Sequence, residues 1–342
     1  MHKLFFTQST CVLLEGAVTL EQLMEALREW KPEPHDAPEG HWAMGSTSSV
    51  TIETARGRIV VDAVPHPWPD EMGGVDEVHD EELFAAWSMH MFGPFVWPLA
   101  LARAIRHRWD EPSAAAAERH QAFVRIRHIA DPEMDTKGYD PFAELQALYA
   151  VSRDLMAGLP GALVCFNPNG EALRSDETVG QLLRQGEEQR VPPYPLWSNT
   201  RTMRVEGDWI LCDSVGNAQI DLPDVEACCP ADQANASDPA GAVLAATEYM
   251  IRKGDVFCDG DTAEFGGTGM WRAARFDESV TAPPRPVICF FPDGSTLPPF
   301  LRDRPREDSG PPGDVTKPSP APSPSSTAAI AKPERPWWKF WG

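Results

Sequence analysis

The clearest pattern in this sequence is a helical spacing of apolar residues that occurs twice behind the same capping signal. The signal is a Thr followed three residues later by Gln, at Thr19 and again at Thr178. In such a capping box, each of the two side chains bonds the backbone N–H of the other residue. The apolar positions that follow are Leu20, Leu23, Met24 and Leu27 in the first copy and Val179, Leu182 and Leu183 in the second. The pattern predicts two amphipathic helices.

Strand-like apolar runs flank both predicted helices in the same order. The preceding runs are 4–6 with 11–14 in the first copy and 162–166 in the second. After each helix and a polar gap, a Trp (Trp42 or Trp197) opens an alternating segment, and a second strand follows at 59–64 or 210–215. Asp62 and Asp213 occupy equivalent places in those strands. A further helix and a closing strand then complete each copy, at 83–91 with 122–129 and at 239–252 with 286–291.

This order predicts an α+β fold made of two ferredoxin-like βαββαβ halves, related by an internal duplication and packed as one body. The halves span 1–135 and 136–300, with a connecting helix at 140–158 in the second. Asp140 can cap that helix with Pro141 in its first turn. The alternative is that two unrelated α+β segments share a few residues.

A change of composition near residue 301 marks the end of the predicted body. Residues 301–335 are rich in Pro and Ser, a composition that buries too little apolar surface to fold, and they predict a disordered linker. The chain ends in a Trp-rich motif at 336–342, whose large and basic side chains are Trp337, Trp338, Lys339, Phe340 and Trp341. Such a motif is expected to dock on a partner protein; weak contact with a membrane surface, or with its own body, stays open.

Composition limits the kinds of partner that the protein is expected to bind. The 342 residues carry a formal net charge of -21, which disfavours nucleic acid and favours a partner protein with a basic surface. No apolar run is long enough to span a bilayer, and the first residues lack the pattern of a secretory signal. The seven cysteines are scattered and odd in number, as expected for reduced thiols. We therefore expect a cytoplasmic protein.

Two loops and two shorter segments present candidate binding residues. In the first loop, three prolines fix the backbone around His66, Trp68 and Asp70. Alternatively, that loop is a rigid crossover with Trp68 in the core. The equivalent place in the second half carries Asn217, Gln219 and Asp221, and its alternative is an Asx turn that starts a short helix. The two shorter candidates are Asn167, within a sequence typical of a β-turn, and Asn199, at the start of a strand.

Templates for catalysis and metal binding do not match. The sequence has no Gly-x-Ser-x-Gly elbow, no Walker loop, no dinucleotide-binding Gly-x-Gly-x-x-Gly and no His-Glu-x-x-His. Cys228 and Cys229 are adjacent and lack a Cys-x-x-Cys partner. We assign no catalytic residue and expect neither a cofactor nor a metal.

Seven segments, taken in order, resemble a bacterial family described as domain of unknown function 4261. The segments are LFFTQSTCVLLEG, IVVDAVPHPWPDEMG, FGPFVWP, CFNPNGE, LWSN, DSVGNAQIDLPDVEA and VICFFPDG. The resemblance covers about residues 1–293 and implies no catalytic residue, cofactor or substrate. It implies a cytosolic bacterial protein of the kind encoded near secreted-toxin and type VI secretion genes.

Two functions follow as expectations. The first is a non-enzymatic protein that binds a partner protein, as an immunity or accessory protein of a toxin or type VI secretion system. The acidic body and the lack of a catalytic template favour it. The alternative is an enzyme acting on a small polar substrate through the His66–Asp70 or the Asn217–Asp224 loop.

Overall fold

The computed structural model describes residues 6–35, 48–71, 78–130, 139–265, 267, 269–302 and 304. The chain divides into two units, residues 1–307 and 308–342. The Trp-rich motif at 336–342 and most of the predicted linker at 301–335 lie outside the described residues. Within the described ranges, none of the helices has the length and apolar character needed to cross a bilayer.

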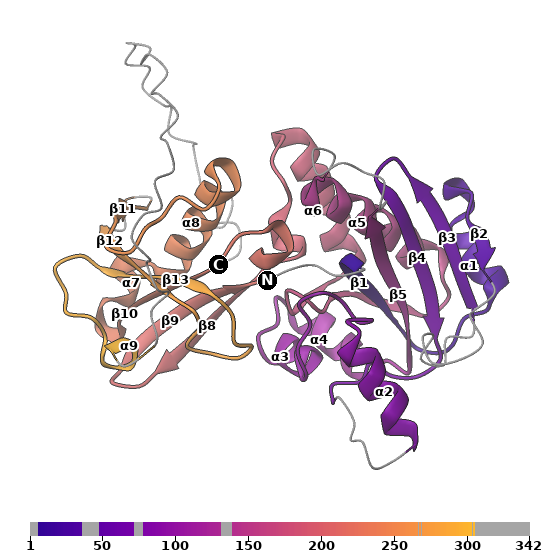
Figure 1. The fold of residues 1–342 in the computed structure, drawn as a ribbon, viewed down its shortest axis with the longest axis horizontal. Coiled ribbons are helices and arrows are strands. Elements are labelled where there is room, and N and C mark those ends of the chain that lie inside the picture. Colours follow the sequence, from indigo (N-terminus) through magenta and orange to yellow (C-terminus); the bar gives the residue numbers. More distant parts are fainter. Residues whose placement is uncertain are drawn as a thin grey trace, which may run out of the picture. The chain divides into compact units, whose positions relative to one another are not determined.

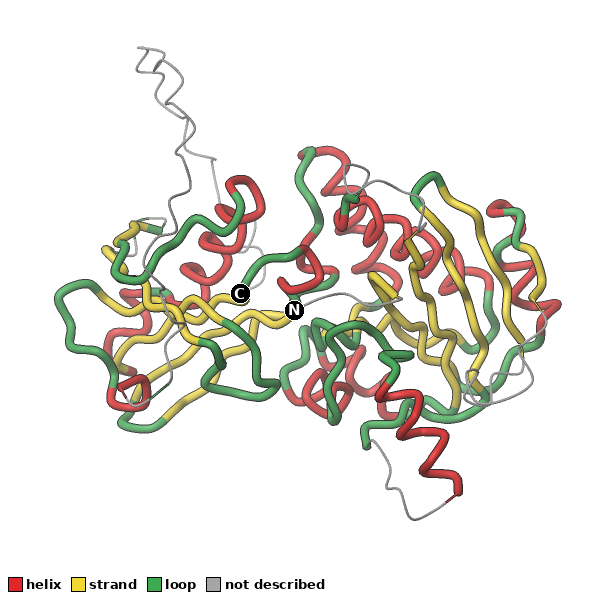
Figure 2. Tube along the Cα trace, in the orientation of Figure 1, coloured by secondary structure: helices red, strands yellow, loops and turns green. Residues whose placement is uncertain are grey.

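The first unit contains two β-sheets, each covered by helices or loops (Figures 1 and 2). The first sheet has seven strands in the order β2-β3-β4-β5-β1-β6-β7, and every neighbouring pair is antiparallel. Its strands are β1 (Phe6–Leu14), β2 (Glu33–His35), β3 (Ser48–Thr54), β4 (Gly57–Val64), β5 (Ala122–Ala130), β6 (Ala162–Asn167) and β7 (Ala172–Arg174).

Both faces of the first sheet are buried, so that β1 is buried from Thr7 to Leu14, its polar residues included. Along β1, Val12 and Leu14 point to one face and Cys11 and Leu13 to the other. The first face packs on α1 (Leu20–Ala26) and α5 (Pro141–Gly158). The second face packs on the segment that carries α2 (Val78–Ser88), α3 (Ala100–Arg106) and α4 (Glu111–Glu118).

The second sheet has six strands in the order β11-β12-β13-β10-β9-β8. Its pairs are antiparallel except β10 and β13, which run parallel. Its strands are β8 (Asn199–Val205), β9 (Trp209–Val215), β10 (Asp224–Pro230), β11 (Thr262–Glu264), β12 (Met270–Phe276) and β13 (Val287–Pro292). Helix α8 (Pro239–Lys253) covers one face, and Leu301 of α9 (Pro299–Arg302) is buried on the other.

The remaining helices complete the described fold. They are α6 (Asp176–Gln189), α7 (Ala234–Ser237) and the 3-10 turns η1 (Arg28–Trp30), η3 (Tyr194–Leu196), η4 (Asn217–Ile220) and η5 (Ala231–Gln233). Two of them, α6 and η3, lie between the two sheets along the chain. The chain passes from the first sheet to the second between β7 and β8. The predicted division at residues 135 and 136 therefore falls inside the first sheet, because β6 and β7 still belong to it.

The helix-start predictions were correct at two places and wrong at a third. Thr19 caps α1 with the complete capping box, and Asp140 caps α5 with Pro141 in the first turn. Thr178, however, lies inside α6, because Ser175 accepts the N–H of Thr178 and starts the helix three residues earlier. Asp176 and Glu177 in the first turn also favour the earlier start.

The α+β class is observed, but the two ferredoxin-like βαββαβ halves are not. Strand β6, the predicted first strand of the second half, pairs with β1 in the first sheet, where Val164 and Phe166 enter the core beside Leu13. In addition, β5 lies between β4 and β1, whereas the first and third strands of a ferredoxin-like βαββαβ unit are neighbours. One element of the proposed duplication remains: Asp62 and Asp213 are both buried in the second strand of a hairpin.

Candidate functional site

Buried side-chain amides join the two sheets. Gln8 on β1 donates from Nε2 to the backbone carbonyl of Gln219 at 2.7 Å, and Asn167 on β6 donates to Oε1 of Gln219 at 2.9 Å. Gln219 itself donates from Nε2 to the carbonyl of Trp197 at 2.8 Å. All four residues are inaccessible to solvent. Each of these bonds replaces one that water would otherwise supply. This group of four residues, called the seam below, fixes the loop that carries η4.

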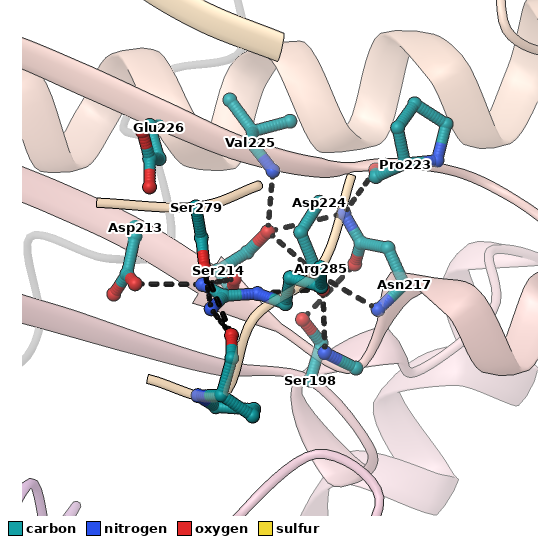
Figure 3. Close-up of polar contacts among 12 residues, drawn as sticks. Ser198, Asp213, Ser214, Asn217, Pro223, Asp224, Val225, Glu226, Ser279 and Arg285 are labelled. Atoms are coloured by element: carbon teal, nitrogen blue, oxygen red, sulfur yellow. Dashed lines mark hydrogen bonds and ion pairs between the residues drawn. The ribbon is translucent and has the colours of Figure 1, made fainter. Parts of the chain in front are cut away.

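A chain of buried ion pairs continues from this seam into the second sheet. Arg201 on β8 contacts Glu171 at 3.1 Å and Asp213 at 2.5 Å, and Arg103 of α3 contacts the other oxygen of Glu171 at 2.6 Å. Arg285, just before β13, contacts Asp213 at 2.7 Å and Asp224 at 3.0 Å, as Figure 3 shows for its surroundings. The guanidinium of Arg285 also donates to three backbone carbonyls, Thr281, Pro283 and Ser214.

Burial and charge act in opposite directions on these carboxyl groups. Burial would raise the pKa of Asp213, but attraction to Arg201 and Arg285 outweighs it and holds that pKa below its usual range. At Asp224 burial dominates and the pKa is raised despite Arg285. Burial also raises the pKa of Glu226 to about 7, although Arg285 opposes the shift. The carboxylates nearest to Arg285 in turn raise its pKa, against the effect of its burial.

A cleft of about 280 Å³ opens above Arg285 and Asp224. One wall comes from the first sheet's side, through Phe95, Trp97 and Asn169, and the others come from the second sheet's side. The remaining lining residues are Val215, Gly216, Ala218, Asp221, Leu222, Pro223, Asp224, Asp255, Arg275, Pro283, Arg285 and Pro286. Its volume is at the lower end of the range of small-molecule sites, roughly 300–1,000 Å³, and suits one or two side chains.

The polar groups on the cleft floor are engaged inside the protein. Asp224 accepts bonds from Ser214 Oγ at 2.9 Å and from the backbone N–H of Asn217 at 3.0 Å, besides Arg285. Asn169 bonds Ser9 and the backbone N–H of Phe95. At the rim, in contrast, the Asp221 side chain is exposed and Trp97 is 41% exposed. A ligand therefore meets the Asp221 carboxylate, the Trp97 ring and the partly exposed Asp255–Arg275 ion pair, next to apolar walls.

None of the residues predicted in the first loop lines the cleft. Trp68 is 5% exposed and makes edge-to-face contacts with Phe92, Phe123 and Phe166 at 5.1 to 5.3 Å between ring centroids. Asp70 accepts the N–H groups of Leu101 and Ala102, both at 2.8 Å, and so caps the start of α3. His66 is exposed. Trp68 thus occupies the core, the alternative weighed for this loop.

The predicted amide residues are hydrogen-bonded within the protein, and two of them, Asn167 and Gln219, meet in the seam. Asn217 and Gln219 are inaccessible, and each polar atom of both side chains has a partner within the protein. Asn199 bonds the carbonyls of His107 and Glu171, and Asn167 bonds Gln219 and the N–H of Gly170. The loop forms the short helix η4, as the alternative interpretation expected. Of the predicted site residues, Asp221 is the one that lines the cleft.

Sequence reasoning missed Trp97, Asn169 and Arg285 as lining residues. Trp97 belongs to FGPFVWP, a segment noted for its resemblance and not for its chemistry. Arg285 stands among three prolines, Pro283, Pro284 and Pro286, where the chain offers backbone carbonyls but few N–H groups to bond them. A lone Arg in such a segment indicates a guanidinium group that donates hydrogen bonds to these carbonyls.

In the described ranges, the His, Cys, Asp and Glu side chains do not group into a metal site, and most of the thiols are buried. No cluster of three His, Cys, Asp or Glu side chains suited to a metal ion occurs among the residues that the structure describes. Six cysteines are buried and Cys258 is exposed. Burial raises the pKa of Cys165 to about 11 and of Cys212 to about 12, which makes their thiolates scarce near neutral pH.

The described residues form a two-sheet α+β protein with a cleft at the junction of its sheets. A family model described as a domain of unknown function, DUF4261, matches residues 213–290. The match runs from Asp213 on β9 to Phe290 on β13 and includes Asp224 and Arg285, and it confirms the family resemblance over that part of the chain. A search of curated proteins and a search of solved structures found no match.

Proposed function

We propose that this protein binds a partner protein by receiving a basic side chain of the partner, flanked by apolar ones, in the cleft. The observation that carries the proposal is the rim, where the exposed Asp221 carboxylate and the half-exposed Trp97 ring border one hollow. A carboxylate and an aromatic face together favour Lys or Arg, through charge and cation–π attraction. The apolar walls, formed by Phe95, Leu222 and several prolines, suit the flanking side chains.

Long-range charge supports the same class of partner. The chain's net charge of -21 raises the encounter rate with a basic protein and lowers it with an acidic one. The family resemblance supplies a biological setting: a bacterial cytoplasm and an immunity or accessory role beside a toxin or type VI secretion system. Docking of the Trp-rich motif on a partner or membrane surface stays a prediction, because that motif lies outside the described residues.

The alternative, a reaction on a small polar substrate, needs a polar group of the Asn217–Asp224 loop that is available to the substrate. The side chains of Asn217, Gln219 and Asp224 are each hydrogen-bonded within the protein. Asp221 is the exposed acid of that loop, and it accepts a hydrogen bond from Tyr139 at 2.8 Å. A binding role requires no rearrangement of these groups, so we favour it.

A comparative pull-down tests the proposal. Full-length protein and its variants Trp97→Ala and Asp221→Asn are used as baits for lysate of the native host, at low and at high salt. Asn tolerates the left-handed backbone of Asp221, whose φ is 58°. Exposed positions away from the cleft, in Phe84→Ala and Glu188→Gln, give matched controls. The proposal expects a protein retained by the wild type and both controls, lost from both cleft variants and weakened by salt; equal retention by all five baits contradicts it.

A further inference from the structure

A second buried ion cluster lies on the first sheet, on the face covered by the α2 to α4 segment. At its centre is Asp62 on β4, whose Oδ2 atom lies 3.0 Å from Nε and 2.9 Å from Nη2 of Arg125. Nη2 of Arg127 contacts the same oxygen, and Ser49 donates to Oδ1 at 3.0 Å. All four residues are at most 5% exposed. Two guanidinium groups therefore share one carboxylate, which leaves one positive charge in excess within the cluster.

The ion cluster of the second sheet and that of the first sheet both join two Arg side chains to a buried Asp. They differ in how many guanidinium nitrogens have an acceptor and in how much negative charge is present. In the second sheet, each guanidinium nitrogen of Arg201 and Arg285 has at least one acceptor, and Glu171 and Asp224 supply further negative charge. In the first sheet, Nη1 of Arg125 and Nε of Arg127 are buried and have no acceptor among the described residues. The other contacts of Arg127 are weak: Met91 Sδ at 3.6 Å and the Phe6 ring at 4.2 Å.

A guanidinium N–H that is buried without an acceptor destabilises the folded protein, because it has lost its water without gaining a hydrogen bond. Burial lowers the pKa of Arg127 to about 10, and Arg125 adds to that effect, so Arg127 remains charged near neutral pH. An oxyanion from solution would supply what the cluster lacks: a negative charge and several acceptor oxygens in the planar geometry that guanidinium groups recognise.

The cluster lies at the border between the open and the buried part of this face. Along β4 the side chains on this face change from exposed Arg58 through half-buried Val60 to buried Asp62. Val60 is the cross-strand neighbour of Arg127, and Ile129, the next residue on this face of β5, is again half-buried. The least buried neighbours of Arg127 on this face are therefore Val60 and Ile129, and this is the side from which an anion would approach.

We propose that Arg127 and Arg125 form a binding site for a small oxyanion, a phosphate or a carboxylate, on the first sheet. The site is independent of the cleft and of the proposed partner. Asp62 acts in it as an internal competitor: its carboxylate holds both guanidinium groups in place and also lowers their attraction for a second anion. This gives opposite expectations for two substitutions, since Arg127→Gln removes a donor of the site and Asp62→Asn removes the competing charge.

The experiment measures thermal unfolding of the full-length chain against the concentration of inorganic phosphate, and separately of acetate, at constant ionic strength. The wild type should gain stability along a saturable curve, as expected for binding to the folded state. Arg127→Gln should lose the saturable rise, and Asp62→Asn should bind the anion roughly tenfold more tightly. Arg58→Gln, which removes the same charge from an exposed position of the same face, should behave as the wild type.

The two anion series distinguish phosphate from a carboxylate as the preferred oxyanion, and saturation in either supports the site. No saturable rise in the wild type with either anion overturns the proposal. An equal rise in the wild type and Arg127→Gln overturns it too, because it would be a general salt effect. If Arg127→Gln does not fold, the Asp62→Asn arm decides: unchanged or weaker anion binding in that variant overturns the proposal.

Discussion

Gln8 and Gln219 are 211 residues apart in the sequence, yet the side-chain amide of Gln8 donates a 2.7 Å hydrogen bond to the backbone carbonyl of Gln219. This bond connects the first strand of the first sheet to the turn that borders the cleft. The Gln219 side chain in turn holds Trp197 and Asn167. The cleft is therefore built on a buried polar seam, in which loss of one partner leaves another polar group without a hydrogen bond.

Removal of the Gln219 side chain should weaken the whole first unit. Gln219→Ala leaves the amide of Asn167 and the carbonyl of Trp197 buried without their partner, and we expect a loss of about 2 to 4 kcal/mol in the free energy of unfolding. Urea denaturation measures it. The exposed Gln181 on α6 offers the control Gln181→Ala, expected within about 0.5 kcal/mol of the wild type. Similar losses in both variants would argue against the seam.

Trp68 should behave as a core residue and His66 as a surface residue. Trp68→Ala removes a ring that contacts three phenylalanines and should cost about 3 to 5 kcal/mol of stability. His66→Ala, two residues away and exposed, should change stability by less than about 0.5 kcal/mol. Thermal unfolding of both variants distinguishes the two roles. A Trp68→Ala protein with unchanged melting but impaired partner binding would restore the binding-loop hypothesis.

At Gly170, the turn between β6 and β7 lies close to the backbone of Trp197 and Val215. A Cβ atom at this position would lie 1.8 Å from the carbonyl oxygen of Trp197, which is backbone and cannot rotate away. Gly170→Ala should therefore destabilise the protein by about 3 kcal/mol or more, or prevent folding. A Cβ atom at Gly16 would meet nothing within 4 Å, so Gly16→Ala should be nearly neutral. Expression level and urea midpoint compare the two; a well-folded Gly170→Ala protein would show that the loops separate easily.

Glu226 should make stability fall as the pH rises toward neutrality. Burial raises its pKa from 4.5 to about 7, so the folded state holds this proton more tightly than the unfolded state does. Its contribution is fully present below the unfolded pKa and is lost as the pH rises through the folded pKa. Relative to Glu226→Gln, the wild type should lose about 3 kcal/mol between roughly pH 4.5 and pH 8.

The comparison needs urea denaturation across that pH range for the wild type, Glu226→Gln and the exposed control Glu188→Gln. The control should follow the pH profile of the wild type. Parallel profiles for the wild type and Glu226→Gln would show that Glu226 does not titrate in this range in the folded protein.

Local signals in the sequence located most of the elements but not their partners. Thr19 and Asp140 predict the starts of their helices, because the capping residue and its bond partner lie only three residues apart. At Thr178 the same capping signal gave a wrong helix start, because Ser175 accepts the N–H of Thr178 and begins the helix earlier. Nothing local to 162–166 indicates that this strand pairs with β1 instead of opening a second half. Strand pairing is a long-range choice, decided by which core buries Val164 and Phe166.

The cleft illustrates the same limit for function. Asn217 and Gln219 are recognisable as polar residues in a loop, but only the fold shows that Ser198, Asn167 and Trp197 use up their hydrogen-bonding groups. Trp97 reads as one more apolar residue, although the fold leaves it half-exposed at the rim. Polarity alone could not separate a ligand contact from an internal bond.

The most direct test of partner binding through the cleft is site-specific photo-crosslinking in the native host. A photoreactive phenylalanine derivative replaces Trp97 at the rim in one strain and the exposed Phe84 of α2 in another. After irradiation, the account predicts a discrete crosslinked protein for position 97, absent for position 84, whose crosslinked peptide carries Lys or Arg beside apolar residues. No crosslink at position 97, or the same products at both positions, would contradict it.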